Sequence, residues 1–272
     1  MSSIISRLKK MLPLSRQVRI LAGLIPPMFW FRCALVSSKL QGRVAEKIGG
    51  NRKLTELVMR DHWLREFTDR GRFPVPIRLT GREVLEEFLP RGPVLYCPIH
   101  VGMSDIPLRF LADNGYPMPV PVADSGRMVR VDRYPVMGMD LAIPAVAAGP
   151  HALARVRTLL LHGTSVACLA DSDYLDERFN ANPMRLAARM RVPLIFPWAR
   201  LAKDGVIDCE FRTAPHPYGE SKAAMEENLN ALRQIRDGIL ESLGMGEGTE
   251  RALQPQIGTR KAVKETVQSP AA

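Results

Sequence analysis

The sequence lacks several patterns that would assign a common enzyme class or a nucleic-acid-binding function. Aromatic residues make up only 6% of the 272 residues, and no nucleic-acid-binding module is recognisable. Nucleic acid is therefore not favoured as the binding partner of this basic chain. No Gly-x-Ser-x-Gly stretch occurs, so a serine-hydrolase elbow is not supported. The glycine-rich run at 244–248 has no strand before it and no helix after it, which argues against a nucleotide-binding loop there.

Cysteine is scarce and scattered. The chain has four cysteines, Cys33, Cys97, Cys168 and Cys209, and no two of them have the spacing of metal ligands. Cys97 and Cys168 lie in apolar runs. We therefore expect free and mostly buried thiols, as in a protein of a reducing compartment.

Acidic residues are outnumbered by basic ones. Lys and Arg total 38 and Asp and Glu total 28, which gives a net charge of +10. A surface with this excess attracts an anionic partner, such as nucleic acid, an acidic carrier protein or an anionic membrane. The apolar fraction of 46% is ample for a core, and the length suits one domain with appendages.

The N-terminal segment lacks an uninterrupted apolar run. The stretch ILAGLIPPMFWFRCALV at 20–36 contains Pro26, Pro27 and Arg32, so it is too short and too broken for a membrane-spanning helix. No small-residue cleavage site is obvious, so no signal peptide is predicted. Two interpretations stay open: a basic helical hairpin with an aromatic tip in the membrane interface, or a helical arm packed on the main domain.

Hydrophobic periodicity predicts alternating strands and helices. Strands are expected within 71–79, 92–99, 118–123, 165–170, 192–201 and 206–212, and helices at 81–90, 105–114, 150–162, 182–190 and 221–243. Several strands are apolar throughout, which is typical of a sheet covered on both faces. The sequence therefore predicts an α/β domain at 71–244, with a mixed, mostly parallel sheet flanked by helices. A helical, membrane-apposed arm is expected at 1–70 and a flexible tail at 245–272.

The stretch CPIHVGMSD at 97–105 puts a histidine and an aspartate where a strand gives way to a helix. Ser104 suits the N-cap of that helix, and Asp105 falls in its first turn, where the helix dipole favours negative charge. Gly102 permits a tight turn, so the side chains of His100 and Asp105 can meet. A carboxylate bonded to one imidazole nitrogen fixes the tautomer and makes the other nitrogen a general base. The alternative is a structural histidine beside a helix-capping aspartate.

Three segments in order carry a family resemblance. They are IRLTGREVLEEFLPRGPVLYCPIHVGMSD, ALARVRTLLLHGTSVACLADSDYL and MRLAARMRVPLIFPWARLAKDG. The chain thereby resembles the lysophospholipid acyltransferase superfamily over about residues 78 to 212. It looks most like the bacterial branch that acylates lipid A, in which a strand ends in His-x-x-x-x-Asp/Glu. The resemblance implies a glycerolipid-acyltransferase-like fold.

The resemblance also implies a reaction. An acyl group would pass from a thioester, on acyl carrier protein or coenzyme A, to a hydroxyl or amine of a lipid or glycolipid. His100 would be the general base and Asp105 would orient and stabilise it, although the lipid A branch commonly has Glu at the second position. No metal and no prosthetic group is implied. The expected location is the cytoplasmic face of a bacterial inner membrane, in peripheral or interfacial contact.

Further charged residues are candidates for substrate binding. The family has an arginine for phosphate or carrier contacts between its two motifs, and Arg127, Arg130 and Arg133 all lie in that interval. Arginine suits phosphate because its planar fork gives two parallel hydrogen bonds. Solvated surface charge is the alternative for these three residues.

The Asp-x-Asp segment and one later arginine complete the expected site. The resemblance implies that Asp171 and Asp173 shape the substrate site. Without the resemblance, an Asp-x-Asp pattern after an apolar strand could also hold a divalent ion, as in many glycosyltransferases. Arg200, after the Val-Pro strand, is either a further phosphate contact or an ordinary surface arginine.

The sequence departs from the lipid A branch where acceptors are recognised. Residues 229–272 lack the usual tryptophan and clustered arginines, and the segment after the Asp-x-Asp pair lacks the usual Phe-Phe-Gly-like piece. The acceptor therefore stays open among phospholipids, glycolipids and secondary metabolites. A membrane-surface binding protein that kept the fold and lost catalysis is the competing class.

Overall fold

The computed structural model describes residues 13, 15–24, 60, 76–116, 120–123, 134–135, 142–143, 146–147, 151–171 and 179–242. Most of the predicted arm at 1–70, and all of the predicted tail at 245–272, lie outside the described residues. The described part is mainly an α/β domain, and the bounds predicted for it at 71 and 244 lie outside the described residues.

Strands and helices alternate along this domain. The strands are β1 (Ile77–Thr80), β2 (Leu95–Tyr96), β3 (Val120–Ala123), β4 (Tyr134–Pro135), β5 (Ala142–Ile143), β6 (Val146–Ala147), β7 (Val166–Cys168), β8 (Leu194–Leu201) and β9 (Ile207–Thr213). The helices are α5 (Arg82–Phe88), the short 3-10 helix η1 (Leu89–Arg91), α6 (Asp105–Asp113), α7 (Ala152–Leu161), α8 (Asn182–Met190) and α9 (Lys222–Ser242).

Seven of the described strands form one sheet in the order β1-β9-β8-β2-β7-β3-β6. Only β8 and β9 pair antiparallel, and every other neighbouring pair in this sheet is parallel. The prediction of a mixed, mostly parallel sheet with helices is therefore confirmed. The strands β4 and β5 form a separate antiparallel pair.

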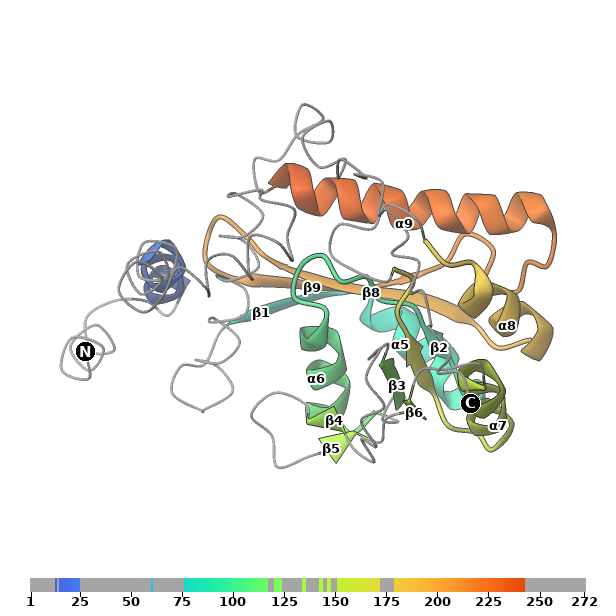
Figure 1. The fold of residues 1–272 in the computed structure, drawn as a ribbon. Helices are drawn as coiled ribbons and strands as arrows, with labels where there is room; N and C mark the ends of the chain where they lie inside the picture. Colours follow the sequence, from blue (N-terminus) through green and yellow to red (C-terminus); the bar gives the residue numbers. More distant parts are fainter. Residues whose placement is uncertain are drawn as a thin grey trace, which may run out of the picture.

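Helices cover both faces of the large sheet (Figure 1). On one face, α9 lies along β8 and β9, and buried residues of α7, α8 and α9 share one core with strand residues such as Leu95 and Phe196. On the opposite face, α5 and α6 pack against residues such as Tyr96 and Ile195 in a second core. Successive residues of a strand point to opposite faces, so the apolar strands feed both cores, as the sequence predicted.

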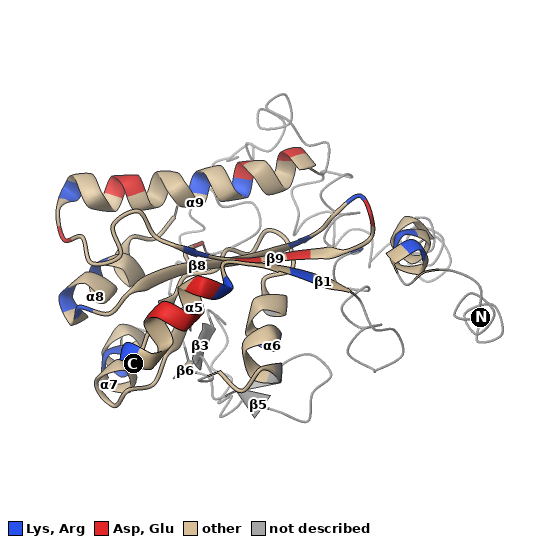
Figure 2. Ribbon diagram, turned by 180° about the vertical axis from the view of Figure 1, so that it is seen from behind, with Lys and Arg blue, Asp and Glu red and all other residues tan. Residues whose placement is uncertain are grey.

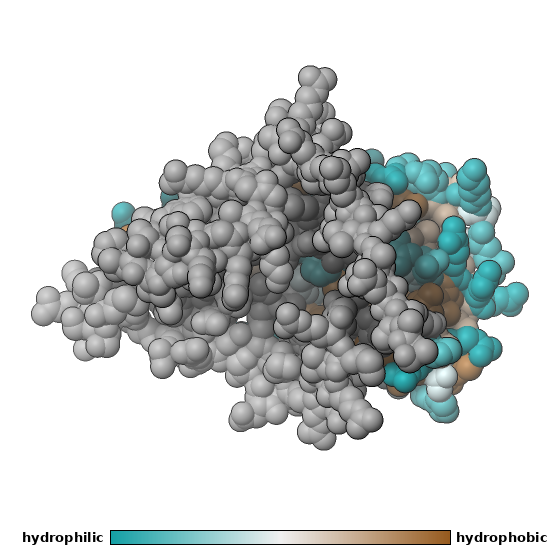
Figure 3. Space-filling view, in the orientation of Figure 1, coloured by the Kyte–Doolittle hydropathy of each residue, from teal (hydrophilic) through white to brown (hydrophobic). Residues whose placement is uncertain are grey.

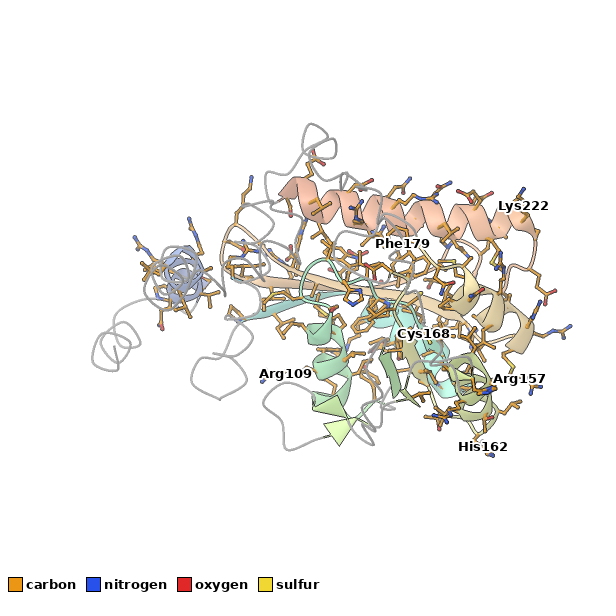
Figure 4. All side chains as sticks on the ribbon, in the orientation of Figure 1. Arg109, Arg157, His162, Cys168, Phe179 and Lys222 are labelled. Carbon is orange, nitrogen blue, oxygen red and sulfur yellow. The ribbon has the colours of Figure 1, made fainter. Side chains whose placement is uncertain are left out.

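Side chains fill the space between α9 and the sheet, and Phe179 lies in this layer (Figure 4). On the face drawn in Figure 3, the described residues show mostly hydrophilic side chains on the outside, with apolar side chains visible between them. The buried residues of α7, α8 and α9 recur on one side of each helix, which is the amphipathic pattern expected of elements with one face on a core.

The described helical residues 15–24 of the predicted arm pack on the domain. Val18 is fully buried and belongs to the same core as α5 and α6, and Leu21 packs against it. A Cβ atom added at Gly205, in the β8–β9 turn, would lie 2.6 Å from the Cγ atom of Arg19. These contacts concern residues 15–24 alone, and both interpretations of the arm stay predictions. The aromatic tip at 29–31 lies outside the described residues.

Candidate functional site

His100 and Asp171 meet at one edge of the sheet. His100 lies four residues after β2, and Asp171 lies three residues after β7. Because β2 and β7 are parallel neighbours, their carboxyl ends meet at the same edge. This edge is where parallel α/β sheets usually bind ligands.

Asp171 binds both the backbone and the imidazole of His100. The backbone N–H of His100 donates to the two carboxylate oxygens, with N–O distances of 3.1 Å and 2.8 Å. The imidazole Nδ1 lies 2.9 Å from Oδ1 of Asp171. The Asp171 side chain is 1% exposed and the His100 side chain is 24% exposed. A buried carboxylate that accepts these bonds holds the ring in one orientation, and it favours the tautomer with the proton on Nδ1.

The main chain around the pair is fixed as well. The Ala170 N–H donates to the carbonyl of Pro98 at 3.0 Å, and the Ala170 carbonyl accepts from the N–H of Asn180 at 2.6 Å. The first bond ties the ends of β2 and β7 together, and the second ties the residue before Asp171 to the segment that leads into α8. The pair is therefore a built feature of the sheet edge.

The turn after His100 packs closely on β8. Gly102 has a φ of 85°, in the left-handed region where glycine is favoured. A Cβ atom there would lie 2.5 Å from the carbonyl oxygen of Ala199, and the neighbouring Met103 N–H donates to that same oxygen at 2.9 Å. The predicted need for glycine is confirmed, and its reason is the approach to β8 as well as the turn.

Helix α6 begins at Asp105, as predicted, with Ser104 at the N-cap. The Ser104 side chain makes no capping hydrogen bond. Its φ of −57° and ψ of −21° are helical, whereas a capping side chain needs an extended backbone to reach the first amides. The capping role expected of Ser104 is therefore wrong. The Asp105 side chain lies outside what the structure describes, so its predicted role as partner of His100 stays a prediction.

A buried thiol precedes each member of the pair by three residues. Cys97 follows β2 and Cys168 ends β7. Burial, with smaller contributions from Cys168 and Asp171, raises the pKa of the Cys97 thiol well above its usual range. Burial likewise raises the pKa of Cys168 to about 12. Both thiols therefore stay protonated at neutral pH and are unsuited to act as nucleophiles.

Cys209 is buried too, and all three of these thiols are free. The expectation of free, buried thiols is thus confirmed for them. Cys33 lies outside the described residues.

Arg200 is already engaged by the protein. Its Nε lies 3.5 Å from a carboxylate oxygen of Asp208 on β9, and its Nη1 donates to the carbonyl of Gly238 on α9 at 3.4 Å. Its guanidinium also lies 5.4 Å from the ring centre of Trp198. These contacts bind β8 to β9 and α9, which gives Arg200 a structural explanation.

The other predicted binding residues, Arg127, Arg130, Arg133 and Asp173, lie outside the described residues. Asp171 was expected to shape the substrate site, and its direct contact with His100 was not foreseen from sequence. The sequence does carry a signal for this contact. Asp171 comes just after an apolar strand, as His100 does, and the carboxyl ends of neighbouring parallel strands meet at one edge of a sheet.

The described residues contain neither a cluster suited to a metal ion nor a helix suited to spanning a membrane. No group of three or more His, Cys, Asp or Glu residues in this part of the chain could hold a metal ion. Among the helices that the structure describes, none has the length and apolar character needed to cross a membrane.

The chain was also compared with known proteins. No family model matches it, and a search of curated proteins found no matching relative.

Proposed function

We propose that the protein is an acyltransferase in which His100 acts as general base and Asp171 holds its ring. The observation that carries the proposal is the 2.9 Å contact between Nδ1 of His100 and a carboxylate that is almost wholly buried. The ordered sequence resemblance to lysophospholipid acyltransferases supplies the reaction class. Asp105, five residues after His100 in sequence, is proposed as a second acidic group at the same sheet edge.

The proposed chemistry needs one proton carrier. Nε2 of His100 takes the proton from the acceptor hydroxyl or amine as that atom attacks the thioester carbon. A new C–O or C–N bond forms, and the tetrahedral intermediate expels the thiolate as the C–S bond breaks. The imidazolium then gives its proton to the leaving sulfur. Asp171 stabilises the positive charge that the ring carries between these steps.

Surface charge supports an anionic donor or surface. The helices α7 and α8 contain arginines and no acidic residue, and Figure 2 shows basic residues on both of them. Arg155, Arg157, Arg185 and Arg189 are exposed there. An acidic carrier protein, coenzyme A or an anionic membrane would each be attracted to this face. We propose that the enzyme works at the cytoplasmic face of a bacterial inner membrane.

The test is a transfer assay with a matched histidine control. The purified protein is incubated with acyl-coenzyme A or acyl carrier protein and a panel of lipid acceptors, and acylated products are identified by mass spectrometry. His100→Gln should abolish transfer. The control is His216→Gln, because His216 also pairs with a carboxylate, that of Glu227 at 2.5 Å, on an exposed surface away from the sheet edge.

The control variant should retain full activity. If a folded His100→Gln variant transferred acyl groups at the wild-type rate, His100 would not be the general base. Equal loss in both variants would show that the histidine substitutions act through stability.

A further inference from the structure

Helices α7 and α8 carry a concentration of exposed positive charge. Their sequences, ALARVRTLLL and NPMRLAARM, contain four arginines and no acidic residue (Figure 2). A fifth arginine follows α8 directly as its C-cap residue. The two helices contact each other and bury their other sides in one core. The exposed arginines, here called the arginine face, are Arg155, Arg157, Arg185, Arg189 and Arg191.

The arginine face cannot form the intrahelical ion pairs that other exposed arginines have. Beside α5, Arg91 pairs with Glu87 at 3.3 Å, and on α9, Arg233 pairs with Glu226 at 2.8 Å. Pairs of this kind need an acidic residue on the same helix, and neither α7 nor α8 has one. Like charges on adjoining helices repel each other, so this face attracts an anionic partner.

Exposed leucines accompany these charges on α7. Leu153 is 38% exposed and Leu161 is 60% exposed. They lie four residues before and four residues after Arg157, and residues four apart share one side of a helix. Figure 4 shows Arg157 and His162 on the outer side of α7, away from the sheet. Apolar side chains next to arginine are typical of surfaces that bind another protein.

The backbone at Arg191 would suit glycine better than arginine. Arg191 has a φ of 52° and a ψ of 37°, in the left-handed region. It is the only non-glycine residue with positive φ in the part of the chain that the structure describes. Glycine is the usual residue just after a helix in this conformation, because a Cβ atom is unfavourable there. The attraction of a cation to the helix C-terminus offsets only part of this cost, which indicates that the arginine has a role outside the fold.

The arginine face reaches the edge of the sheet opposite to His100. Helices α7 and α8 lead into the amino ends of β7 and β8, and both strands run parallel to β2. The C-terminal ends of the helices, with Leu161 and Arg191, therefore lie at the amino edge of the sheet, whereas His100 and Asp171 follow the carboxyl ends of their strands. A flat membrane against these helix ends would hold its lipid headgroups at the far edge from His100. A folded protein can dock there and extend a flexible arm.

We propose that the arginine face docks an acidic protein that carries the acyl thioester on a flexible arm. Carboxylates of the partner would pair with the arginines, and its apolar residues would contact Leu153 and Leu161. Small ligands bind in concave sites, whereas these side chains lie on the outer sides of two helices. The inference rests on the proposed acyl transfer and deepens it, because it selects a protein-borne donor over free coenzyme A.

The first test measures docking without turnover. Apo acyl carrier protein, an acidic protein that here lacks its prosthetic arm, is titrated into the full-length protein by calorimetry. The wild type should bind it, and more weakly as NaCl is raised, because exposed ion pairs are screened. The double variant Arg157→Gln/Arg189→Gln should bind about five- to twentyfold more weakly, since two exposed ion pairs are lost. Leu161→Ser should weaken binding several-fold at every salt concentration, because apolar contacts are not screened.

The matched control removes the same charge from the opposite face of the sheet. Arg82 and Arg91 are both exposed, in and just after α5, which packs in the other core. Arg82→Gln/Arg91→Gln should leave the affinity for the carrier protein unchanged. An equal loss of affinity in the two double variants would show attraction to the net charge alone, and it would overturn the docking surface.

Arg191→Gly separates docking from a structural role. Glycine removes the charge and suits the left-handed backbone, so the Tm of this variant should equal or exceed that of the wild type. Its affinity for the carrier protein should nevertheless fall about two- to fivefold, because one exposed ion pair is lost. A lower Tm with unchanged affinity would show that Arg191 serves the fold, and it would contradict the proposal.

Vesicle binding tests a membrane as the competing occupant. Wild type and Arg157→Gln/Arg189→Gln are floated with vesicles of phosphatidylglycerol and phosphatidylethanolamine, and both should float equally. If the variant loses vesicle binding and keeps its affinity for the carrier protein, the face is a membrane surface and the proposal fails. Absence of carrier binding by the wild type would overturn it as well. Carrier binding without acyl transfer would leave the docking surface standing and refute only the proposed function.

Discussion

Replacing Asp171 by Asn tests the proposed site most directly. The carboxylate accepts three hydrogen bonds from His100, two from the backbone N–H and one from Nδ1. Asn has one acceptor oxygen, so its NH₂ group must face either the backbone N–H or the ring. If the amide faces the ring, Nδ1 becomes the acceptor, the proton moves to Nε2 and the base is lost.

The size of the effect follows from these contacts. General-base catalysis contributes about 10²- to 10⁴-fold to rate, so the kcat of Asp171→Asn should fall within that range. A buried, charge-assisted hydrogen bond contributes about 1.5 to 3 kcal/mol, so the free energy of unfolding should fall by a similar amount. Activity is measured by product formation and stability by urea unfolding, both at pH 7.

Asp105→Asn is the comparison that decides which carboxylate holds the ring. If Asp171 does so, its substitution should reduce kcat at least as much as Asp105→Asn, and only Asp171→Asn should perturb the imidazole tautomer seen by ¹⁵N NMR. Wild-type activity of Asp171→Asn, together with loss of activity in Asp105→Asn, would refute the reasoning.

Four further predictions concern packing, thiol burial, thiol titration and the membrane. Gly102→Ala should lower the free energy of unfolding by more than about 1 kcal/mol, because the new Cβ would lie 2.5 Å from the Ala199 carbonyl oxygen; unchanged urea unfolding would contradict the close approach. Cys97, Cys168 and Cys209 should resist alkylation at pH 8 until the protein unfolds, and fast labelling in the native state would contradict their burial. Since burial raises the folded pKa of Cys168 to about 12, above its unfolded value, its contribution to stability is present below about pH 9 and is lost toward pH 12. Tm should therefore fall as pH rises from 8 to 10, less so in Cys168→Ala, and equal slopes for the two proteins would contradict this. Replacing the aromatic run at 29–31 by serines should reduce flotation with anionic liposomes in high salt, because apolar burial is not screened; wild-type protein that does not float would refute interfacial binding. The serine variant is preferable to deletion of residues 1–36, which would also remove the buried Val18.

Short-range patterns predicted most of the described elements. The helices at 105–114, 182–190 and 221–243 were expected and are found as α6, α8 and α9 with ends that agree within one residue. The strands β4, β5 and β6 were not predicted. Each has only two residues, too few for an alternation of apolar and polar residues to be visible. The strand expected at 92–99 is found as β2, Leu95–Tyr96, and backbone hydrogen bonds to its neighbours continue at Cys97 and Pro98.

From the sequence we could predict the alternation of helices and strands, the mostly parallel sheet, and His100 as a candidate site residue. These depend on hydrophobic period and turn chemistry, which are local properties of the chain. Tertiary structure alone decided the strand order, and with it the partner of His100. Asp171 is 71 residues away in sequence and reaches the imidazole because β7 pairs with β2. Likewise, only the packing of α9 on β8 shows that Arg200 has protein partners.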